Sequence, residues 1–358
     1  MIAGLAGQGG GIVGGLWRDR GSCLAAEGHA NTAQRLQANE GGRDLLEYGA
    51  LVSVVMPIFN RAHLVPRVVG SILAQTYRNL DVVIVDDCST DDIEGAIAAL
   101  GDPRVRLIRR ERNGGAAAAR NTGVAAARAD WIAFHDSDDY CTSDRIDLSV
   151  RKLMGLPQDY IGVYGIALFY TDASEENYGQ RATFFRPFLS EHQLSGDLSS
   201  RTLQGNMMNL PTFLVKKTAL QSAGLFDERL QQNEDWDLCL RLTQRGKFGF
   251  VPEFLILSPI PIDPTVSAAR VSRSVRQGPR SFIRITGKLR HAGIGGSELS
   301  PHYASAAQYL MRMDRPGFAR RFLRAALVLK PWQPRLWAHY LLSFTPKLHA
   351  RLRRQQRL

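Results

Sequence analysis

The sequence predicts an α/β fold in which a mainly parallel sheet carries helices on both of its faces. Two observations predict it. Short apolar runs alternate with segments of helical spacing between residues 51 and 134, and polar clusters follow three of the apolar runs directly. The chain has 358 residues, 44% of them hydrophobic, so it can bury a sizeable core.

In the first half, apolar runs and helical spacing alternate. The expected strands are Leu51–Ile58, Leu80–Val85, Val105–Ile108 and Trp131–Phe134. The expected helices are Arg61–Thr76, Asp91–Leu100 and Ala116–Ala129. Ligands of such sheets gather beyond the carboxyl ends of the strands, so we expect the polar clusters that follow these strands at one edge.

The second half predicts fewer regular elements. Strands are expected at Ile161–Tyr170 and Thr212–Val215, with a loop over Tyr178–Ser200. Glu234–Arg245 is expected to be a helix that stops at Gly246. After Pro264 the pattern becomes helical and basic, with helices at Ala304–Met313, Gly317–Leu329 and Leu336–Phe344.

Charge divides the chain unevenly. The net charge is +11, but residues 266–358 hold 19 Lys and Arg against two acids, while residues 1–265 hold 26 against 32. An acidic body argues against a uniform nucleic-acid-binding surface, so no nucleic-acid partner is expected. We expect a flexible Gly-rich leader over 1–48, a body over 49–265 and a basic helical extension over 266–358.

The composition also limits location and cofactors. No stretch reaches the ~20 apolar residues that span a bilayer, and the N-terminus lacks the basic region of a signal peptide. The expected location is therefore the cytoplasm. The four cysteines form no Cys-x-x-Cys pair, which disfavours a structural zinc site.

The strongest chemical signal is the run from Asp136 to Asp139, which holds three carboxylates directly after a strand. Carboxylates this close repel one another unless a cation is present, and hard divalent ions bind carboxylate and phosphate oxygens. The alternative is a turn in which the Asp side chains cap the next helix.

Two further clusters have both a chemical and a structural interpretation. Asp86 and Asp87 end a strand, where a carboxylate can accept from a nucleobase or ribose, or can make a turn before the next helix. Asn113-Gly114-Gly115 leads into a helix with Arg120, which can reach a diphosphate or form a surface ion pair.

Glu234 and Asp235 open a predicted helix. A carboxylate there can act as a general base toward an acceptor hydroxyl. Acids in the first turn also stabilise a helix through its dipole, which is the alternative interpretation.

Taken together, these motifs are more specific than any of them alone. They are Val55-Met-Pro-Ile-Phe-Asn60, Ser71-Ile-Leu-Ala-Gln-Thr76, Val85-Asp-Asp-Cys-Ser-Thr-Asp91, Asn113-Gly-Gly115, Ala119-Arg-Asn121, Asp136-Ser-Asp-Asp139 and Glu234-Asp-Trp-Asp237. In this order the sequence resembles the family 2 glycosyltransferases, which have the GT-A fold, over about residues 50–265.

The resemblance implies a role for each matched residue. Ile58 and Phe59 would line the nucleobase pocket, and Asp87 would hydrogen-bond the base. The other residues implied in binding the nucleotide-sugar are Pro57, Asn60, Asp86, Asn113, Gly114, Arg120 and Asp136. Asp138, with Asp136 and with Asp139 as a substitute, would bind Mn²⁺ or Mg²⁺. Asp235 would be the catalytic base, with Glu234 beside it.

The implied activity is inverting, metal-dependent transfer of a sugar from a nucleotide-sugar, by resemblance a UDP-sugar, to a hydroxyl. The expected acceptor is a glycan, a lipid-linked molecule or a protein, in cell-surface polysaccharide or glycolipid synthesis. The sequence departs from the family after Leu257, where many members carry an Arg and a His; Asp263 is a candidate metal ligand instead. Gln277-Gly-Pro-Arg280-Ser281 lacks the Trp that processive members carry after the Arg, so we expect one or few sugars to be added.

Two other functions remain open. One is a sugar-nucleotide-forming nucleotidyltransferase, disfavoured because Asn60-Arg61-Ala62-His63 replaces the usual Gly-rich loop. The other is a non-catalytic basic protein that binds membranes or nucleic acid. The basic extension itself can attach peripherally to the anionic inner face of the cell membrane or pack as helices on the body.

Overall fold

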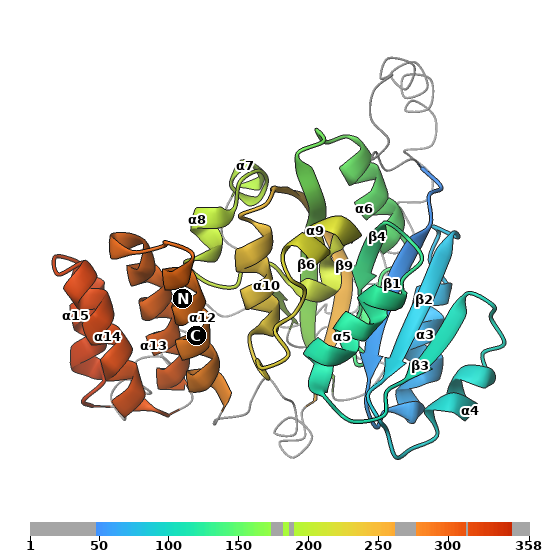
Figure 1. The fold of residues 1–358 in the computed structure, drawn as a ribbon, viewed down its shortest axis with the longest axis horizontal. Coiled ribbons are helices and arrows are strands. Elements are labelled where there is room, and N and C mark those ends of the chain that lie inside the picture. The colour runs from blue at the N-terminus through green and yellow to red at the C-terminus, as the bar shows by residue number, and fades with distance from the viewer. Residues whose placement is uncertain (1–47, 173–181, 186–189, 262–276, 313, 346–358) are drawn as a thin grey trace, which may run out of the picture.

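The computed structural model describes residues 48–172, 182–185, 190–261, 277–312 and 314–345. It confirms the predicted α/β class: one mixed sheet lies between helices, with the strand order β3-β2-β1-β4-β8-β6-β9-β5 and β7 paired to β6 (Figure 1). The strands are β1 Val52–Ile58, β2 Leu80–Asp86, β3 Val105–Arg109, β4 Trp131–Phe134, β5 Tyr140–Cys141, β6 Tyr160–Asp172, β7 Ala182–Phe185, β8 Leu214–Lys216 and β9 Lys247–Pro261.

The first four strands are parallel, as the sequence predicts. They are connected by η1 Ala62–Leu64, α3 Val65–Leu73, α4 Ile93–Ala98 and α5 Gly115–Ala126. Side chains alternate between two cores: Val54 and Met56 of β1 pack with α3, whereas Val55 packs with Val124 of α5. Gly123 of α5 lies directly over Val55, where an added Cβ would come within 2.4 Å of that side chain.

The second half contains more regular structure than the sequence predicts. The loop expected over Tyr178–Ser200 holds β7, α7 Glu191–Leu194 and the start of α8 Ser199–Thr202. The long strand β9 was not predicted, because Pro252 interrupts its apolar pattern. Its pairing with β6 is irregular near Gly165 and Ile166, next to that proline. The remaining elements of the body are α6 Arg145–Met154, η2 Leu210–Thr212, α9 Lys217–Ser222 and α10 Glu234–Leu242.

The C-terminal helices form a group at one end of the molecule (Figure 1). They are α12 Gln277–His291, η4 Gly296–Glu298, α13 Leu299–Arg312, α14 Pro316–Leu329 and α15 Pro334–Leu342. A third core joins them to the body, with Trp236 and Leu240 of α10 packed against Phe282 and Ile285 of α12. Of the two possibilities left open for the basic extension, packing as helices on the body therefore applies to the described part of it.

Two expectations fall outside the part of the chain that the structure describes: residues 1–47 of the leader, and Asp263 as a metal ligand. Among the described helices, none combines the length and apolar character that crossing a bilayer requires.

Candidate functional site

The loops that follow β1 and β2 are joined at the edge of the sheet. Asn60 adopts a left-handed conformation (φ 51°), and its carboxamide oxygen accepts a hydrogen bond from the Thr90 amide at 2.7 Å. Its own amide donates to Ser89 Oγ at 2.9 Å. Ile58 is buried, whereas Phe59 is 45% exposed, so Phe59 is the side chain of this pair that faces outward.

Asp86 and Asp87 are both buried and both accept several hydrogen bonds. Asp86 accepts from the Ser89 amide at 2.9 Å and from Arg109 at 3.0 Å, so it forms the turn that the sequence allowed. Asp87 accepts from the amides of Gly114 and Gly115, at 3.0 and 2.7 Å, and from Arg110. Asn113 closes the arrangement by donating to the Asp87 carbonyl.

Arg120 connects two of the predicted motifs. Its guanidinium donates to Asp136 Oδ1 at 2.7 Å and to Glu234 Oε1 at 2.9 Å, and it lies 5.5 Å from the ring centroid of Phe226. Arg120 is only 5% exposed, so the alternative of a surface ion pair is wrong. Burial opposes its charge, but the two carboxylates raise the pKa of the guanidinium above its usual value.

Asp138 lies beside a different arginine. Arg61 Nη1 lies 3.2 Å from Asp138 Oδ1 and donates to Ser137 Oγ at 2.9 Å. The Asp138 side chain is 24% exposed and that of Arg61 34%. The Asp139 side chain is buried, and its amide donates to the Asp136 carbonyl, so the run is also a turn.

A buried arginine contacts the residues that directly precede the Asp136 turn. Arg145 of α6 donates to the Phe134 carbonyl at 2.6 Å, and its Nη1 lies 3.3 Å from His135 Nδ1. Burial, with the charge of Arg145 adding to it, lowers the pKa of His135 to about 3, so the imidazole is neutral at pH 7. This pair fixes the backbone where β4 passes into the Asp136 turn.

Asp235 has the strongest chemical signature at the site. Its carboxylate accepts from Asn206 Nδ2 at 2.8 Å and from the Trp236 amide at 2.7 Å. Burial raises the pKa of the Asp235 carboxyl to about 6, with repulsion from Glu234 adding to the increase. A base that titrates near neutrality can accept a proton and still be ionised at pH 7.

The arrangement fits a metal ion that arrives with a nucleotide rather than a site made of protein alone. Among the described residues, no group of three or more His, Cys, Asp or Glu side chains lies together as a metal site would need. Asp136 and Asp138 offer partly exposed carboxylates, each paired with an arginine. Carboxylates together with diphosphate oxygens are ligands that hard divalent ions accept.

Sequence reasoning missed three members of this region: Arg61, Asn206 and Phe226. Arg61 directly follows the Asn60 motif, and this position was all in the sequence that indicated a place for Arg61 in the site. Asn206 and Phe226 lie in stretches without a recognised motif, and only the fold brings them to Asp235 and Arg120.

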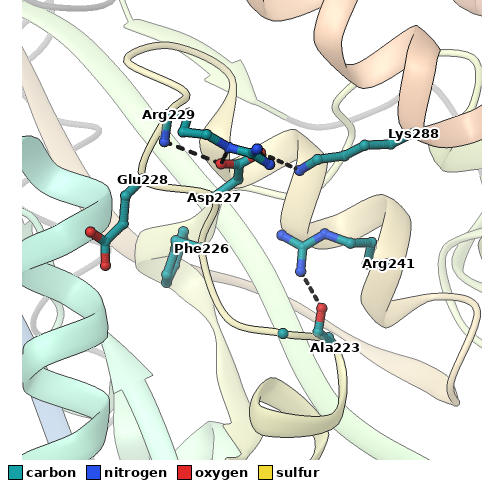
Figure 2. Close-up of a pocket in the computed structure, with 8 residues that line it drawn as sticks. Ala223, Phe226, Asp227, Glu228, Arg229, Arg241 and Lys288 are labelled. Carbon is teal, nitrogen blue, oxygen red and sulfur yellow. Dashed lines mark hydrogen bonds and ion pairs between the residues drawn. The ribbon is translucent and has the colours of Figure 1, made fainter.

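A pocket of about 470 Å³ is lined by the segment 223–229 together with Arg241 of α10 and Lys288 of α12 (Figure 2). Lys288 of α12 extends into it and contacts Asp227 and Asp237, each at 2.8 Å, while Arg241 contacts Asp237 at 2.6 Å. Hydrogen bonds from Arg229 and Lys288 lower the pKa of Asp227 although its burial acts against this. These mutual ion pairs attach α12 to the body.

Comparison with known proteins identifies the body. Residues 53–209 match the family described as Glycosyl transferase family 2. The chain carries a family 2 glycosyltransferase domain. This confirms the resemblance drawn from the sequence motifs, and with it the enzyme class.

Two relatives of the glycosyltransferase are named for sugar transfer. A putative colanic acid biosynthesis glycosyl transferase of Escherichia coli K12, WcaA, is 32% identical over 54% of this chain and 66% of its own. WfgD of Escherichia coli, a UDP-Glc:alpha-D-GlcNAc-diphosphoundecaprenol beta-1,3-glucosyltransferase, is 35% identical over 29% of this chain and 41% of its own. The chain thus spans about two thirds of the first relative and less than half of the second.

A solved structure supports the fold. The mannosyltransferase PcManGT from Pyrobaculum calidifontis, solved with GDP-Man and Mn²⁺, matches with a TM-score of 0.53 and 17% identity. The match covers 89% of this chain and 92% of the mannosyltransferase. The predicted GT-A architecture of the glycosyltransferase is therefore confirmed.

Proposed function

We propose that the protein transfers one sugar from a nucleotide-sugar to an acceptor hydroxyl with inversion, using Asp235 as the base. The observation that carries the proposal is the Asp235 carboxylate itself. It is half-buried, its pKa is raised to about 6 by desolvation and by the neighbouring Glu234, and it adjoins the Glu234–Arg120–Asp136 ion pairs. Those ion pairs connect the expected base to the carboxylates that would bind the donor.

The reaction moves one proton and exchanges one bond. Asp235 accepts the proton of the acceptor hydroxyl while that oxygen bonds to the anomeric carbon, and the bond from this carbon to the diphosphate oxygen breaks. The nucleoside diphosphate leaves with the bonding electrons. A single displacement needs no second carboxylate nucleophile, in contrast to retaining hydrolysis.

The donor side rests on the residues at the sheet edge. Phe59 is exposed beside Asn60 and offers a ring to a nucleobase, while Asp87, Asn113 and Gly114 form the loop that would face it. Mn²⁺ or Mg²⁺, when bound, would supply positive charge to the leaving diphosphate. Asp138, with Asp136, would hold the ion, and Arg61 would exchange Asp138 for a diphosphate oxygen.

The acceptor that we propose is lipid-linked. WfgD, by its name, acts on a diphosphoundecaprenol-linked sugar, and WcaA is named for colanic acid synthesis. The donor would be a UDP-sugar, because WfgD uses UDP-Glc. The place of reaction would then be the cytoplasmic face of the cell membrane.

The test is release of nucleoside diphosphate from a panel of UDP-, GDP-, TDP- and CDP-sugars, with Mn²⁺, with Mg²⁺ and with excess EDTA. We expect release from one donor class, and loss of release in EDTA and in Asp138→Asn. The matched control is Asp144→Asn, which alters an Asp of the adjoining segment that lies outside the proposed site. Release of pyrophosphate would instead indicate a nucleotidyltransferase, and full activity in EDTA would contradict the metal part of the proposal.

A further inference from the structure

Exposed apolar side chains are concentrated on the last two helices. The described residues expose ten large apolar side chains, and six of them lie between Phe318 and Phe344. Single exposed apolar residues are ordinary, but a concentration of them marks an interaction surface.

Helix α15 and the turn that follows it carry an apolar stripe that faces away from the core. Trp337, Leu341 and Phe344 follow one another at helical spacing and are 46%, 64% and 54% exposed. Leu336 lies on the other side of the same helix and is buried in the third core. The helix therefore packs Leu336 inward, while no described helix or strand covers the apolar stripe on its outer side.

Two arginines of α14 lie beside this stripe, one against Phe344 and one against the neighbouring Tyr340. Arg320 lies 4.7 Å from the Phe344 ring centroid and donates to the Ser343 carbonyl at 2.8 Å. Arg324 lies 5.8 Å from the Tyr340 ring centroid and donates to its hydroxyl at 2.8 Å. We call the surface formed by Arg320, Arg324, Trp337, Leu341 and Phe344 the aromatic–basic face; Tyr340 is half-buried against the third core.

The segment that carries this face has charged residues of one sign. Residues 315–345 contain six Lys and Arg and no Asp or Glu. The sequence that follows, residues 346–358, adds five more basic residues and no acid. A partner must therefore supply negative charge next to an apolar layer.

We propose that the aromatic–basic face binds the surface of an anionic lipid bilayer. The Trp337 and Phe344 rings would lie at the level of the headgroups, with Leu341 reaching the acyl boundary and the arginines on lipid phosphates. Helix α15 forms the outer end of the C-terminal group, away from the sheet, so it can approach a flat surface (Figure 1). The inference goes beyond sugar transfer, because it concerns where the enzyme is held and not what it transfers.

Other occupants fit less well. A two-fold interface requires a patch that is complementary to itself. Pairing this face with a second copy would instead bring two positively charged surfaces together. A nucleic acid would supply phosphates, but Leu341 and Val328, which is 82% exposed, gain little from a polyanion without an apolar layer.

The first test is sedimentation of the full chain with vesicles of phosphatidylcholine, alone or with about 30% phosphatidylglycerol. We expect binding only to the anionic vesicles, and weaker binding in high salt. Equal binding to both vesicle types would overturn the electrostatic part of the proposal, and no binding to either would overturn all of it.

Two variants separate the apolar and the charged contributions. Leu341→Ser with Phe344→Ser should weaken binding to anionic vesicles at least tenfold, because both apolar side chains lose their insertion. Arg321→Gln with Arg335→Gln, which alter exposed neighbours of the face, should weaken it about fivefold per charge. The matched controls are Ile283→Ser, 57% exposed on α12, and Arg78→Gln, exposed before β2; neither should change binding.

Fluorescence tests insertion separately from attraction. The emission of Trp337 should shift to shorter wavelength on anionic vesicles, and Trp337→Phe should remove much of that shift. Dimer formation through this face, or RNA binding that Leu341→Ser with Phe344→Ser leaves unchanged, would overturn the membrane assignment. Donor hydrolysis in solution should be unaffected by these variants, so failure of this inference is distinct from failure of the proposed sugar transfer.

Discussion

The acidic side chains in the first turn of α10 lie in two different environments. Glu234 and Asp235 face the sheet edge, where Arg120 contacts Glu234 and the pKa of Asp235 is raised to about 6. Asp237, two residues later, faces α12 and lies with Asp227, whose pKa is lowered by Arg229 and Lys288. The same residue type on one helix thus serves as the proposed proton acceptor at one position and as an anchor for a cation at another.

The difference comes from the cations that the fold brings to each side. The hydrogen bonds described for Asp235 come from neutral groups, Asn206 and the Trp236 amide, and burial is the largest influence on its pKa. Asp237 has both Arg241 and Lys288 within hydrogen-bonding distance. A carboxylate can keep a raised pKa suited to proton transfer where the nearby cation pairs with the adjacent acid instead.

The largest expected effect comes from removing Arg120. Arg120→Met leaves Asp136 and Glu234 without their shared cation, which should lower the free energy of unfolding by about 3 kcal/mol and abolish transfer. This loss of stability is at the low end of what removing one partner of a buried ion pair costs, because the Asp136 side chain is 32% exposed. Urea denaturation measures it. Arg120→Lys keeps the charge but cannot bridge both acids, so it should lose less; an Arg120→Met as stable as wild type would contradict the proposed link.

Replacing the proposed base, Asp235, should destabilise the protein less than Arg120→Met does, but it should still strongly lower the turnover rate. Asp235→Asn should lower turnover by about 10²–10⁴-fold at saturating donor, because an amide cannot accept the proton. Glu234→Gln is the matched comparison and should lose less. If Glu234→Gln is inactive while Asp235→Asn retains turnover, the base is assigned to the wrong residue.

The same variant gives a stability control with a defined sign. A raised carboxyl pKa means that ionisation of Asp235 disfavours the folded state, so Asp235→Asn should melt no lower than wild type at pH 8. That relative advantage should disappear as the pH falls below about 4, where the carboxyl is protonated in both states.

On the other side of α10, the effect should appear in stability alone. Lys288→Met removes the cation shared by Asp227 and Asp237 and should lower the free energy of unfolding by about 1–2 kcal/mol, with turnover unchanged. Lys152→Met, in the last turn of α6, is the control and should change little. A large loss of turnover in Lys288→Met would show that the two clusters are not independent.

The smallest effect is the pH dependence of the base. Turnover should be constant above pH 7 and fall about tenfold per unit below about 6, because the protonated carboxyl cannot accept a proton. Glu234→Gln should move the midpoint to lower pH, because Glu234 repulsion raises the pKa. A midpoint that moves upward or stays in place would contradict this origin of the shift.

The parallel half of the fold could be predicted from the sequence because its signals are local. The apolar runs of β1, β2 and β4 are short and bounded by turn residues, and the motifs follow them directly. Strand β9 was missed because Pro252 and Glu253 interrupt its pattern, while pairing with β6 and β5 maintains it in the fold. Tertiary pairing thus overrides local preference there.

Several members of the candidate site were named from the sequence, but their pairings could not be predicted. Asp136, Glu234 and Arg120 were each expected near the donor or acceptor, but no spacing rule indicates that Arg120 bridges the other two. Asn206 beside Asp235 had no local signal, since 29 residues separate them. The aromatic–basic face was visible only as charge, because sequence spacing does not show which apolar stripe is covered.

The Arg120–Glu234 contact has a consequence for the growing chain. The two residues are separated by 114 positions, whereas Asp136 follows Arg120 after 16. At about 5–20 residues per second, a ribosome reaches Glu234 roughly 6–23 s after Arg120. During that interval Asp136 is the only one of the two acids that can neutralise the arginine, so the Arg120–Asp136 ion pair can form before Phe226 and Glu234 complete the surroundings of Arg120.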